Sequence, residues 1–504
     1  MDHDLVFVDE FDALAIEVKG SKCAPVLPAD EKYPAKTHAR KVAKELNVQS
    51  GLLYLPGLPT QHYEDSDMGP AFRQRRYFFY LTGSTVPDAA VTYDIASDNL
   101  ILWVPYREPR QELYYGKIPG KEECLAKSDI DDCRYVTSVE RFISKHLSNT
   151  GAVLYLLHDT QTPLLEHHRG RITLNTQALL PAMDRARVVK TPYEVRQIRK
   201  ATAVSSAAHK LVLARLRNFR SEADVEATYL ASCISNGSHQ QSYAVIAGSG
   251  PNAGTLHYDA NNESLEGRQV IVFDAGAEWN CYASDITRTL PIGGSFTPEA
   301  SQIYAIVDAM QRAAIQKVKP GVPYRELHLT AQMAAVTGLL RLGILSGGSA
   351  REIFASGVVS ALFPHGLGHH VGLEVHDVLS DRLMGHGPSS LRKIGKRTLI
   401  PAEFSAAMIR NGSDGKHTWD EVGKLAENMI VTIEPGIYFN REYIKAFAED
   451  EPTRAKFIDF GVLERYWEVG GVRIEDMILV KSDGYEIMST APKGEEALRI
   501  INSR

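Results

Sequence analysis

The sequence predicts two domains, a mixed α/β domain over residues 1–182 and a larger second domain over residues 183–504. A chain of 504 residues is too long for a single hydrophobic core. In the first third, short β-rich runs alternate with helical patterns, which is typical of an α/β unit. A strong helix-start signal then appears near residues 181–191 and indicates the beginning of the second domain.

The composition excludes several classes of protein. Hydrophobic residues make up 44%, charged residues 23%, and the net charge is -6, as expected of a soluble globular protein. No basic run or basic excess is available to displace counterions from phosphates, so nucleic-acid binding is not expected. No uncharged apolar stretch reaches the roughly 18 residues of a membrane helix, and acids occupy the N-terminus where a signal peptide has bases. We therefore expect neither a membrane span nor a signal peptide.

The cysteines indicate a reducing compartment. There are five, an odd number, and none has the spacing Cys-x-x-Cys. They are scattered at Cys23, Cys124, Cys133, Cys233 and Cys281. Such cysteines are typical of reduced thiols, so we expect a cytoplasmic protein.

The first domain shows one clear helix and several strands. A helix is predicted over residues 34–46, because Ala39, Val42, Ala43 and Leu46 form one apolar stripe. The β-rich runs are residues 52–55, 77–81, 90–93, 100–104 and 153–157. The charged, turn-rich residues 106–132 are expected at the surface. The basic run 73–76 is either a binding patch or a solvated charge run, and the second interpretation is favoured by sequence alone.

The second domain begins with a capping signal. Thr191-Pro192-Tyr193-Glu194 has the form of a capping box with proline at the first helical position. A helical stripe continues behind it through Val195, Ile198, Thr202, Ser205 and Val212. We therefore predict a long helix here.

Two aspartates are predicted to face each other across a hairpin. The apolar run 269–273 ends in Asp274, and Asp285 follows eleven residues later within a second β-rich run. A short connection between such runs predicts an antiparallel hairpin. A charge at the end of an apolar strand is costly unless it is paired or bound to a metal. For Asp274 alone, solvation at a loop edge is an equally good interpretation.

Two glutamates repeat this pattern near the C-terminus. Glu434 ends the apolar run 429–433, before Pro435-Gly436, and Glu475 lies inside the β-rich run 471–480. A buried salt bridge with Arg473, two residues away on the same strand face, would explain Glu475 alone. Four acids at or within apolar strands of one domain need a shared positive partner. A pair of divalent cations, held by the carboxylates and one imidazole, satisfies that need.

A histidine-rich tract lies between the two pairs of acids. Residues 364–377 contain four histidines, His365, His369, His370 and His376, interspersed with glycines that allow a ligand to come close. Such a tract alone is a weak metal signal. Together with the acids it predicts a metal site.

The order of these motifs resembles that of the pita-bread metallopeptidases. The motifs are Asp274, Asp285, the tract 365–377, Thr432-Ile433-Glu434-Pro435-Gly436 and Arg473-Ile474-Glu475-Asp476. The pattern is most similar to the branch that contains aminopeptidase P and prolidase, whose N-terminal α/β domain also resembles Arg73-Gln74 followed by Phe79-Tyr80-Leu81-Thr82-Gly83. The resemblance implies an α+β pita-bread (creatinase/aminopeptidase) catalytic domain over residues 183–504.

The resemblance also implies a role for each motif residue. Two divalent ions, manganese with cobalt, zinc or iron as substitutes, would be bound by Asp274, Asp285, His369, Glu434 and Glu475. His257, His365 and His376 would hold the substrate carbonyl and move protons, Glu434 would accept a proton from water, and Arg473 would orient a bridging carboxylate. His370 is expected to be a bystander. The resemblance further implies a homodimer.

The implied activity is hydrolysis of the bond before a proline at the second position of a peptide. An Xaa-Pro aminopeptidase is favoured over an Xaa-Pro dipeptidase, which needs an arginine for the free carboxylate. Where prolidases have that arginine this chain has Asp420 and Glu421, although Arg392, Arg397 or Arg410 in the long insertion 378–427 could substitute. A non-enzymatic pita-bread binding module, a creatinase and a methionine aminopeptidase are less consistent with the five ligands and the large N-terminal domain.

Overall fold

The computed structural model describes residues 31–165, 172–384, 392–394, 397–399 and 423–503. From Lys32 onwards these residues belong to one compact unit. The acidic N-terminus and Cys23 lie outside the described residues. The four other cysteines are free and buried, as expected of reduced thiols. Among the described residues, no helix is long and apolar enough to cross a membrane.

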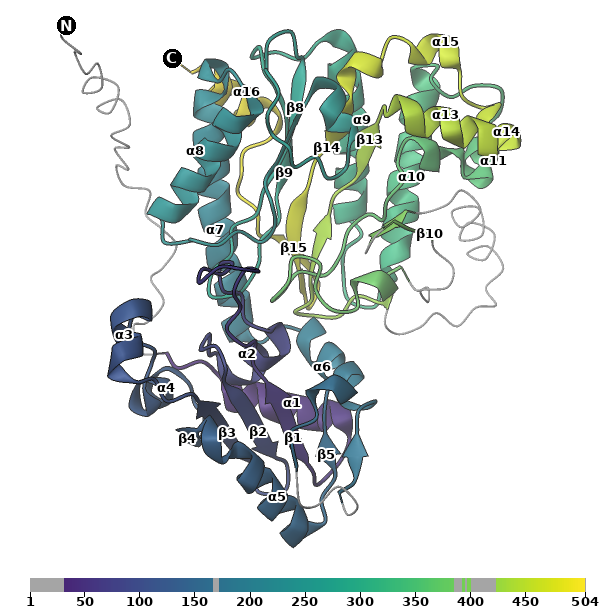
Figure 1. Cartoon of the computed structure of the whole chain (residues 1–504). Helices are drawn as coiled ribbons and strands as arrows, with labels where there is room; N and C mark the ends of the chain where they lie inside the picture. The colour runs from purple at the N-terminus through teal and green to yellow at the C-terminus, as the bar shows by residue number, and fades with distance from the viewer. Residues whose placement is uncertain (1–30, 166–171, 385–391, 395–396, 400–422, 504) are drawn as a thin grey trace, which may run out of the picture. The chain divides into compact units, whose positions relative to one another are not determined.

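The N-terminal part contains a six-stranded mixed sheet in the order β4-β3-β2-β1-β5-β6 (Figure 1). The strands are β1 (Leu52–Pro56), β2 (Ala90–Asp94), β3 (Asn99–Val104), β4 (Asp132–Tyr135), β5 (Leu154–Tyr155) and β6 (Leu174–Asn175). Strands β1, β2 and β3 pair antiparallel, and the outer strands join them in parallel. The mixed α/β prediction is therefore confirmed for this part of the chain.

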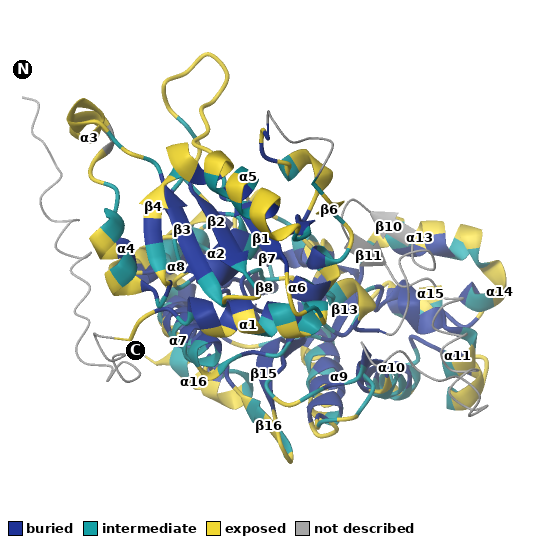
Figure 2. Ribbon diagram, turned by 90° about the horizontal axis from the view of Figure 1, so that it is seen from below, coloured by how far each residue is buried: buried dark blue, intermediate teal, exposed yellow. Residues whose placement is uncertain are grey.

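Helices cover both faces of this sheet. They are α1 (Ala35–Leu46), α2 (Arg76–Thr82), α3 (Pro109–Tyr115), α4 (Lys121–Lys127), α5 (Val139–Thr150) and α6 (Leu179–Val188). Leu53 and Leu55 pack in one core with residues of α1, whereas Leu52 and Tyr54 pack in another with residues of α5. This alternation follows from the two-residue period of a strand. Figure 2 shows the strands buried between helices with exposed outer surfaces.

Two predictions for this part were wrong in detail. Residues 77–81 form helix α2 and not a strand. A short apolar run does not distinguish a buried helix from a buried strand, and here Gly83 ends the helix in the left-handed conformation at φ 66°. Within residues 106–132, Cys124 and Ile130 are buried, so only part of this segment lies at the surface.

The second part is built from small antiparallel sheets backed by helices. The strands are β7 (Ile246–Ser249), β8 (Val270–Asp274), β9 (Thr287–Pro291), β10 (Arg392–Ile394), β11 (Arg397–Leu399), β12 (Ile430–Ile433), β13 (Gly436–Tyr438), β14 (Gly471–Arg473), β15 (Asp476–Lys481) and β16 (Gly484–Ile487). The helices are α7 (Pro192–Arg215), α8 (Glu222–Ser235), α9 (Pro298–Ile315), α10 (Tyr324–Arg341), α11 (Ala350–Ser356), α13 (Arg441–Asp450), α14 (Pro452–Ala455), α15 (Phe460–Leu463) and α16 (Gly494–Asn502).

Two hydrophobic cores hold these sheets in place. Helices α7, α8 and α16 pack in one core with β8, while α9 and α10 pack in the other with β12 and β14. The sheets β7-β8-β9 and β12-β15-β16 therefore meet between two layers of helices (Figure 1). The predicted helix start is confirmed, because Thr191 and Glu194 form a reciprocal capping box at the beginning of α7.

The basic run 73–76 is not a solvated charge run, contrary to the sequence prediction. Arg73 forms two hydrogen bonds of 2.9 and 2.7 Å to the Glu374 carboxylate, and Arg76 donates to Glu278 Oε2 at 2.5 Å. Arg76 and the neighbouring Gln74 are buried. These residues join the N-terminal part to the histidine tract, a partnership between distant segments that sequence spacing does not reveal.

A buried charge cluster anchors the other end of the histidine tract. Asp377 lies 2.6 Å from Arg187 Nη2, in the last turn of α6, and 2.9 Å from Lys190 Nζ, in the segment that links α6 to α7. All three side chains are almost fully buried. Burial alone would raise the pKa of Asp377, but Lys190 and Arg187 hold it at about 2. The segment that carries His376 is therefore fixed electrostatically to the linker between the two parts.

We predict that Asp377→Asn lowers the free energy of unfolding by about 3–5 kcal/mol, because it leaves two buried cations without a counter-charge. Chemical denaturation of both proteins at neutral pH measures the difference. Asp308→Asn is the control, since Asp308 pairs with the exposed Arg312 at 2.9 Å and its loss should cost less than about 1 kcal/mol. Equal, small effects of the two substitutions would contradict the anchoring role of Asp377.

Candidate metal centre and active site

The β8–β9 hairpin brings the two predicted aspartates together. Strands β8 and β9 pair antiparallel with Asp274 opposite Thr287, and Asp285 lies just before β9. The hydroxyl of Tyr243 lies 2.5 Å from Asp274 Oδ1 and 2.5 Å from Asp285 Oδ1. Both carboxylates are buried, so the interpretation of Asp274 as a solvated loop residue is wrong.

A second pair of strands places the two glutamates beside these aspartates. Strand β12 pairs antiparallel with β15, and the last pair is Ile433 with Asp476, so Glu434 and Glu475 lie next to each other at the strand ends. Glu475 lies in a break between β14 and β15 and not inside one strand. Its Oε2 accepts a 2.7 Å hydrogen bond from Thr287 Oγ1, which ties it to the hairpin.

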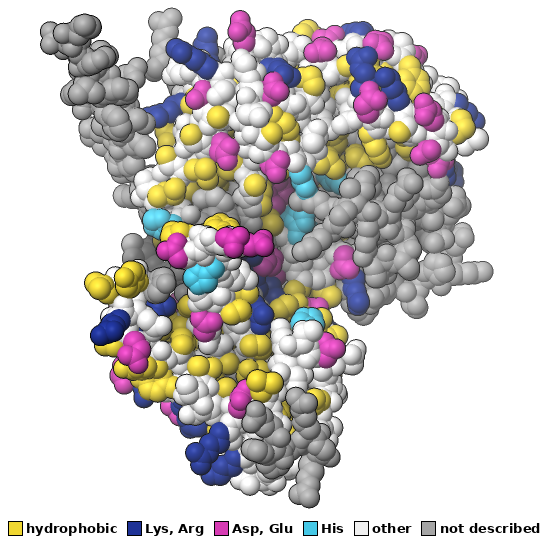
Figure 3. Space-filling view, in the orientation of Figure 1, with side chains coloured by type: hydrophobic (Ala, Val, Ile, Leu, Met, Phe, Trp, Pro, Cys, Tyr) yellow, Lys and Arg dark blue, Asp and Glu magenta, His cyan; other side chains and the backbone are white. Residues whose placement is uncertain are grey.

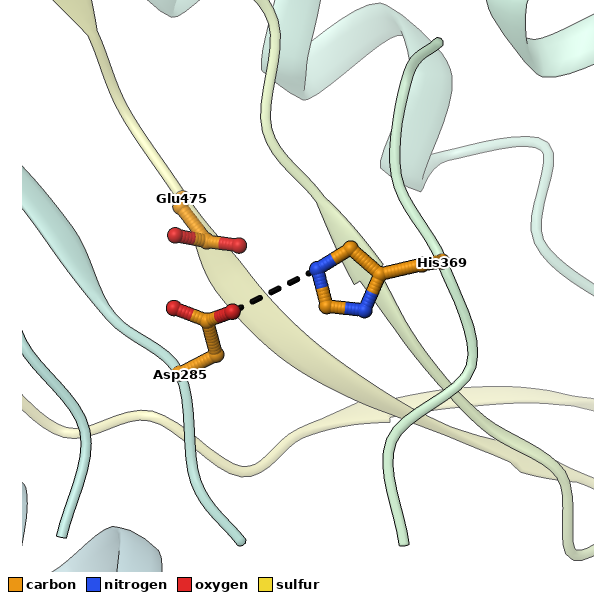
Figure 4. Close-up of side chains that lie close together, drawn as sticks. All are labelled: Asp285, His369 and Glu475. Atoms are coloured by element: carbon orange, nitrogen blue, oxygen red, sulfur yellow. Dashed lines mark ion pairs between the residues drawn. The ribbon is translucent and has the colours of Figure 1, made fainter. Parts of the chain in front are cut away.

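His369 completes the cluster from the histidine tract. Its Nε2 lies 3.3 Å from Asp285 Oδ2 and 3.1 Å from Glu434 Oε1. The ring is oriented by Nδ1, which is 3.1 Å from the carbonyl of His370. Figure 4 shows Asp285, His369 and Glu475 converging from three separate segments, and their ligand atoms all lie within 4.8 Å of one another.

The acids are electrostatically strained without a cation. Burial raises the pKa of Asp274 to about 6, although the Arg473 guanidinium opposes this and Asp285 adds to it. Burial, together with the charges of Asp285 and Glu434, raises the pKa of Glu475 well above its ordinary value. Burial alone would lower the pKa of His369, but its hydrogen bonds to Asp285 and Glu434 raise it to about 10. The imidazole therefore carries part of the positive charge that the carboxylates require.

The donor set fits a divalent metal. Glu475 Oε1 is buried and has no hydrogen-bond partner among the described residues, which is costly for a carboxylate oxygen. Carboxylate oxygens and one imidazole nitrogen, without thiolate, match the preferences of manganese, zinc, cobalt and ferrous ions. The orphaned oxygen and the convergent ligand atoms are both accounted for by a cation at this position.

Arg473 contacts a different acid from the one predicted. Its Nη2 lies 2.7 Å from Asp274 Oδ2, and its Nη1 donates to Tyr438 Oη at 3.0 Å. Among the described residues, Arg473 and Glu475 form no salt bridge with each other, although the sequence offered this pair as an alternative explanation. That explanation assumed that Arg473 and Glu475 lie on the same face of one continuous strand, and the strand is broken at Glu475.

The remaining histidines divide into three groups. His376 lies beside His369 with ring centroids 4.0 Å apart, and His365 contacts Tyr438 Oη at 2.8 Å. His257 lies on an exposed turn and makes none of the contacts that join the cluster. His370 is fully buried, and its ring nitrogens have no hydrogen-bond partner among the described residues, so no contact links its ring to the cluster.

Sequence reasoning missed three hydroxyl groups of the site. Tyr243 contacts both aspartates, Thr287 contacts Glu475, and Tyr438 lies between His365 and Arg473. Thr287 could have been found, because it is two residues after Asp285 on the same strand face. The tyrosines had no comparable signal.

Two family models match this chain. The model of metallopeptidase family M24 matches residues 196–482, and the model of the aminopeptidase P N-terminal domain matches residues 36–155. The chain belongs to metallopeptidase family M24. The predicted metallo-exopeptidase is therefore confirmed, as is the predicted aminopeptidase P branch. The boundary between residues 182 and 183 lies between the matched regions and stays a prediction.

Related sequences cover the whole chain. A probable Xaa-Pro aminopeptidase of Pyricularia oryzae is 54% identical over 100% of this chain and 98% of its own length. A probable Xaa-Pro aminopeptidase of Colletotrichum graminicola is 52% identical over 100% and 99%. These identities far exceed those of the solved structures described next.

Solved structures confirm the fold. A single-residue variant of Escherichia coli aminopeptidase P in complex with substrate has a TM-score of 0.74 at 23% identity, covering 94% of this chain and 99% of that one. The same enzyme, zinc-substituted and in complex with product, has a TM-score of 0.73 at 23% identity, with the same coverage. The predicted pita-bread catalytic domain is confirmed. In the space-filling view, histidine and acidic side chains gather in the hollowed middle of one face (Figure 3).

We predict that metal binding releases protons and strengthens as the pH rises from about 6 to 8. The metal binds ionised carboxylates and neutral imidazole, whereas without metal Asp274 holds a proton below about pH 6 and His369 below about pH 10. Calorimetric titration of the metal-free protein with Mn²⁺, repeated in buffers of different ionisation enthalpy, counts the protons. Binding that is independent of pH and releases no protons would contradict this electrostatic description.

Proposed function

We propose that the protein is an Xaa-Pro aminopeptidase, which removes the N-terminal residue of a peptide whose second residue is proline. The observation that carries the proposal is the convergence of Asp285, His369 and Glu475 from three segments within a family M24 domain. Relatives about half identical over their full length are named probable Xaa-Pro aminopeptidases. A binding module would have no need to retain this buried, mutually repelling set of acids.

The proposed cofactor is a pair of divalent ions, with manganese as the expected metal. Asp274, Asp285, Glu434 and Glu475 would supply oxygen ligands, and His369 would supply the nitrogen. Divalent ions bound there supply Lewis acidity, which activates water and polarises the peptide carbonyl. Because Arg473 holds one oxygen of Asp274, it would fix the orientation of that ligand.

The protein's own groups would move the protons. In the metal-free protein the hydrogen bond and charge of His369 overcome burial and hold the pKa of Glu434 at about 2, so its carboxylate is ionised at neutral pH; with metal bound, Glu434 would accept a proton from water. In the metal-free protein the charge of His369, with burial, lowers the pKa of His376 to about 4, and burial lowers that of His365; the charge of divalent ions bound at His369 would act in the same direction. Both imidazoles are therefore neutral hydrogen-bond partners for a peptide carbonyl. We propose exposed His257 as a proton donor to the leaving nitrogen.

His365 needs a rearrangement before it can contact a substrate. Its Nδ1 lies 2.7 Å from the carbonyl of Gly366, which assigns the proton to Nδ1 and leaves Nε2 to accept from Tyr438 Oη. A substrate hydrogen-bond donor at this position would replace the tyrosine hydroxyl, which would remain bonded to Arg473; contact with a peptide carbonyl would also require the proton to move to Nε2.

The dipeptidase alternative rests on an arginine in the insertion 378–427. Residues 419–422, Arg410 and the side chains of Arg392 and Arg397 lie outside the described part of the chain. The naming of the relatives favours the aminopeptidase. The homodimer and the cytoplasmic location stay predictions.

We predict that Asp285→Ala abolishes metal binding at neutral pH and lowers kcat/KM by at least about a hundredfold, since even indirect supports of a metal ligand cost 10–100-fold. Metal content is measured by elemental analysis after dialysis, beside the hydrolysis of Gly-Pro-Ala. Asp483→Ala, at an exposed turn, is the control and should retain both. Full activity with metal retained in the Asp285 variant would overturn the proposed centre.

We predict that Gly-Pro-Ala is hydrolysed to glycine and Pro-Ala faster than the dipeptide Gly-Pro is hydrolysed, and that Gly-Ala-Ala is cleaved poorly. The reason is that Arg473, which contacts the predicted metal ligand Asp274, is committed to Asp274 and Tyr438 and is not free to pair with a carboxylate directly after proline. Product analysis by mass spectrometry compares the three peptides. Faster cleavage of Gly-Pro would favour the dipeptidase.

A further inference from the structure

A cavity of about 480 Å³ opens beside the predicted metal centre. His376 lines it, and the ring of His376 is 4.0 Å from that of His369 between centroids. Leu55, Phe78 and Leu157 of the N-terminal part form its apolar wall. This size and mixture of groups are typical of a site for a small ligand or a short peptide segment.

Three arginines line the same cavity, but only one acid does. The arginines are Arg75, Arg76 and Arg187, and the acid is Glu374. Arg76 and Arg187 are buried, with 5% and 2% of their surface exposed; Arg76 pairs with Glu278 and Glu374, and Arg187 pairs with Asp377. Arg76 Nη1 and Arg187 Nε nevertheless have no hydrogen-bond partner among the described residues. Buried guanidinium donors without partners favour an anionic ligand.

Arg75 differs from the other two because it has no acidic partner among the described residues. It is half-buried, and its recorded hydrogen bond runs from Nη1 to the carbonyl of Pro56 at 3.1 Å. That bond holds the side chain in place while its charge is not neutralised. Arg75 therefore gives the cavity a net positive charge that a ligand can complement.

We propose that this cavity binds a carboxylate of the peptide substrate on the C-terminal side of the scissile bond, with Arg75 as its principal contact. The inference rests on the proposed function. A peptide's N-terminal amine is cationic and would be repelled by the uncompensated Arg75 guanidinium, whereas a carboxylate matches its planar fork. The substrate would therefore be oriented with its acidic end in the cavity and its amino end away from it.

The carboxylate has two possible sources, the C-terminus of a short peptide or the side chain of an acidic residue after proline. In the first case the protein prefers tripeptides and other short peptides. In the second case it accepts longer peptides with Asp or Glu at that position. Both use the same chemistry in the cavity.

The test compares kcat and KM for Gly-Pro-Ala, Gly-Pro-Ala-amide and Gly-Pro-Glu-amide on the metal-loaded full chain. We expect the wild type to have a KM about tenfold lower for the free acid than for the Ala amide, as expected for one charge-assisted hydrogen bond. Arg75→Gln should remove this preference through KM while kcat stays nearly unchanged, and Arg75→Lys should retain part of it. Arg110→Gln, at an exposed position on α3, is the matched control and should behave as wild type.

The outcomes separate the carboxylate site from the proposed function. If the KM for Gly-Pro-Glu-amide is as low as that for the free acid, the side chain is a source of the carboxylate. If it is as high as that for Gly-Pro-Ala-amide, the source is the C-terminus. Equal KM values for acid and amides in the wild type, or an unchanged preference in Arg75→Gln, would overturn the site while the Xaa-Pro activity stands. Thermal melting shows whether each variant is folded, and Arg75→Lys gives the readout if Arg75→Gln is not. If none of the three peptides is cleaved, both proposals fail.

Discussion

The site depends on the burial of several carboxylates around one imidazole. Asp274, Asp285 and Glu475 are each less than one-tenth exposed, and such a cluster is stable only if a positive charge compensates it. In the structure that charge comes from His369 and Arg473. The raised pKa of Asp274 and Glu475 shows that these two groups do not suffice. This deficit is the physical basis for assigning a divalent cation to the site.

The same constraint explains how the surrounding structure is organised. The four acids meet because the ends of two antiparallel strand pairs, β8 with β9 and β12 with β15, face each other. The helices behind both sheets hold those ends in place. The histidine tract must then be fixed at the open side. It is anchored by Asp377 to the linker before α7 and by Glu374 to the arginines of the N-terminal part. The N-terminal part thus helps to define the active site.

Charge also distinguishes the two ends of the site. The metal centre has an excess of negative charge, whereas the adjoining cavity is lined by three arginines and one acid. A peptide that extends from the metal centre into the cavity would have its polar groups near residues of opposite charge. His376 lies where the metal centre and the cavity meet. Its low pKa keeps its imidazole neutral, so that it adds no charge to either.

The sequence by itself determined the mixed α/β character of the first domain, the capped start of α7 and the four acidic metal-ligand candidates, and the family resemblance singled out His369 as the fifth. These features are local, because apolar periodicity, capping chemistry and acids on apolar strands are visible within short windows. The tertiary structure alone decided that residues 77–81 form a helix, that Arg76 is buried against Glu278, and that Arg473 pairs with Asp274. It also revealed Tyr243 and the arginine-lined cavity. Those features depend on contacts between residues from 31 to 202 positions apart or on the packing of ambiguous apolar runs, and neither leaves a periodic signal in the sequence.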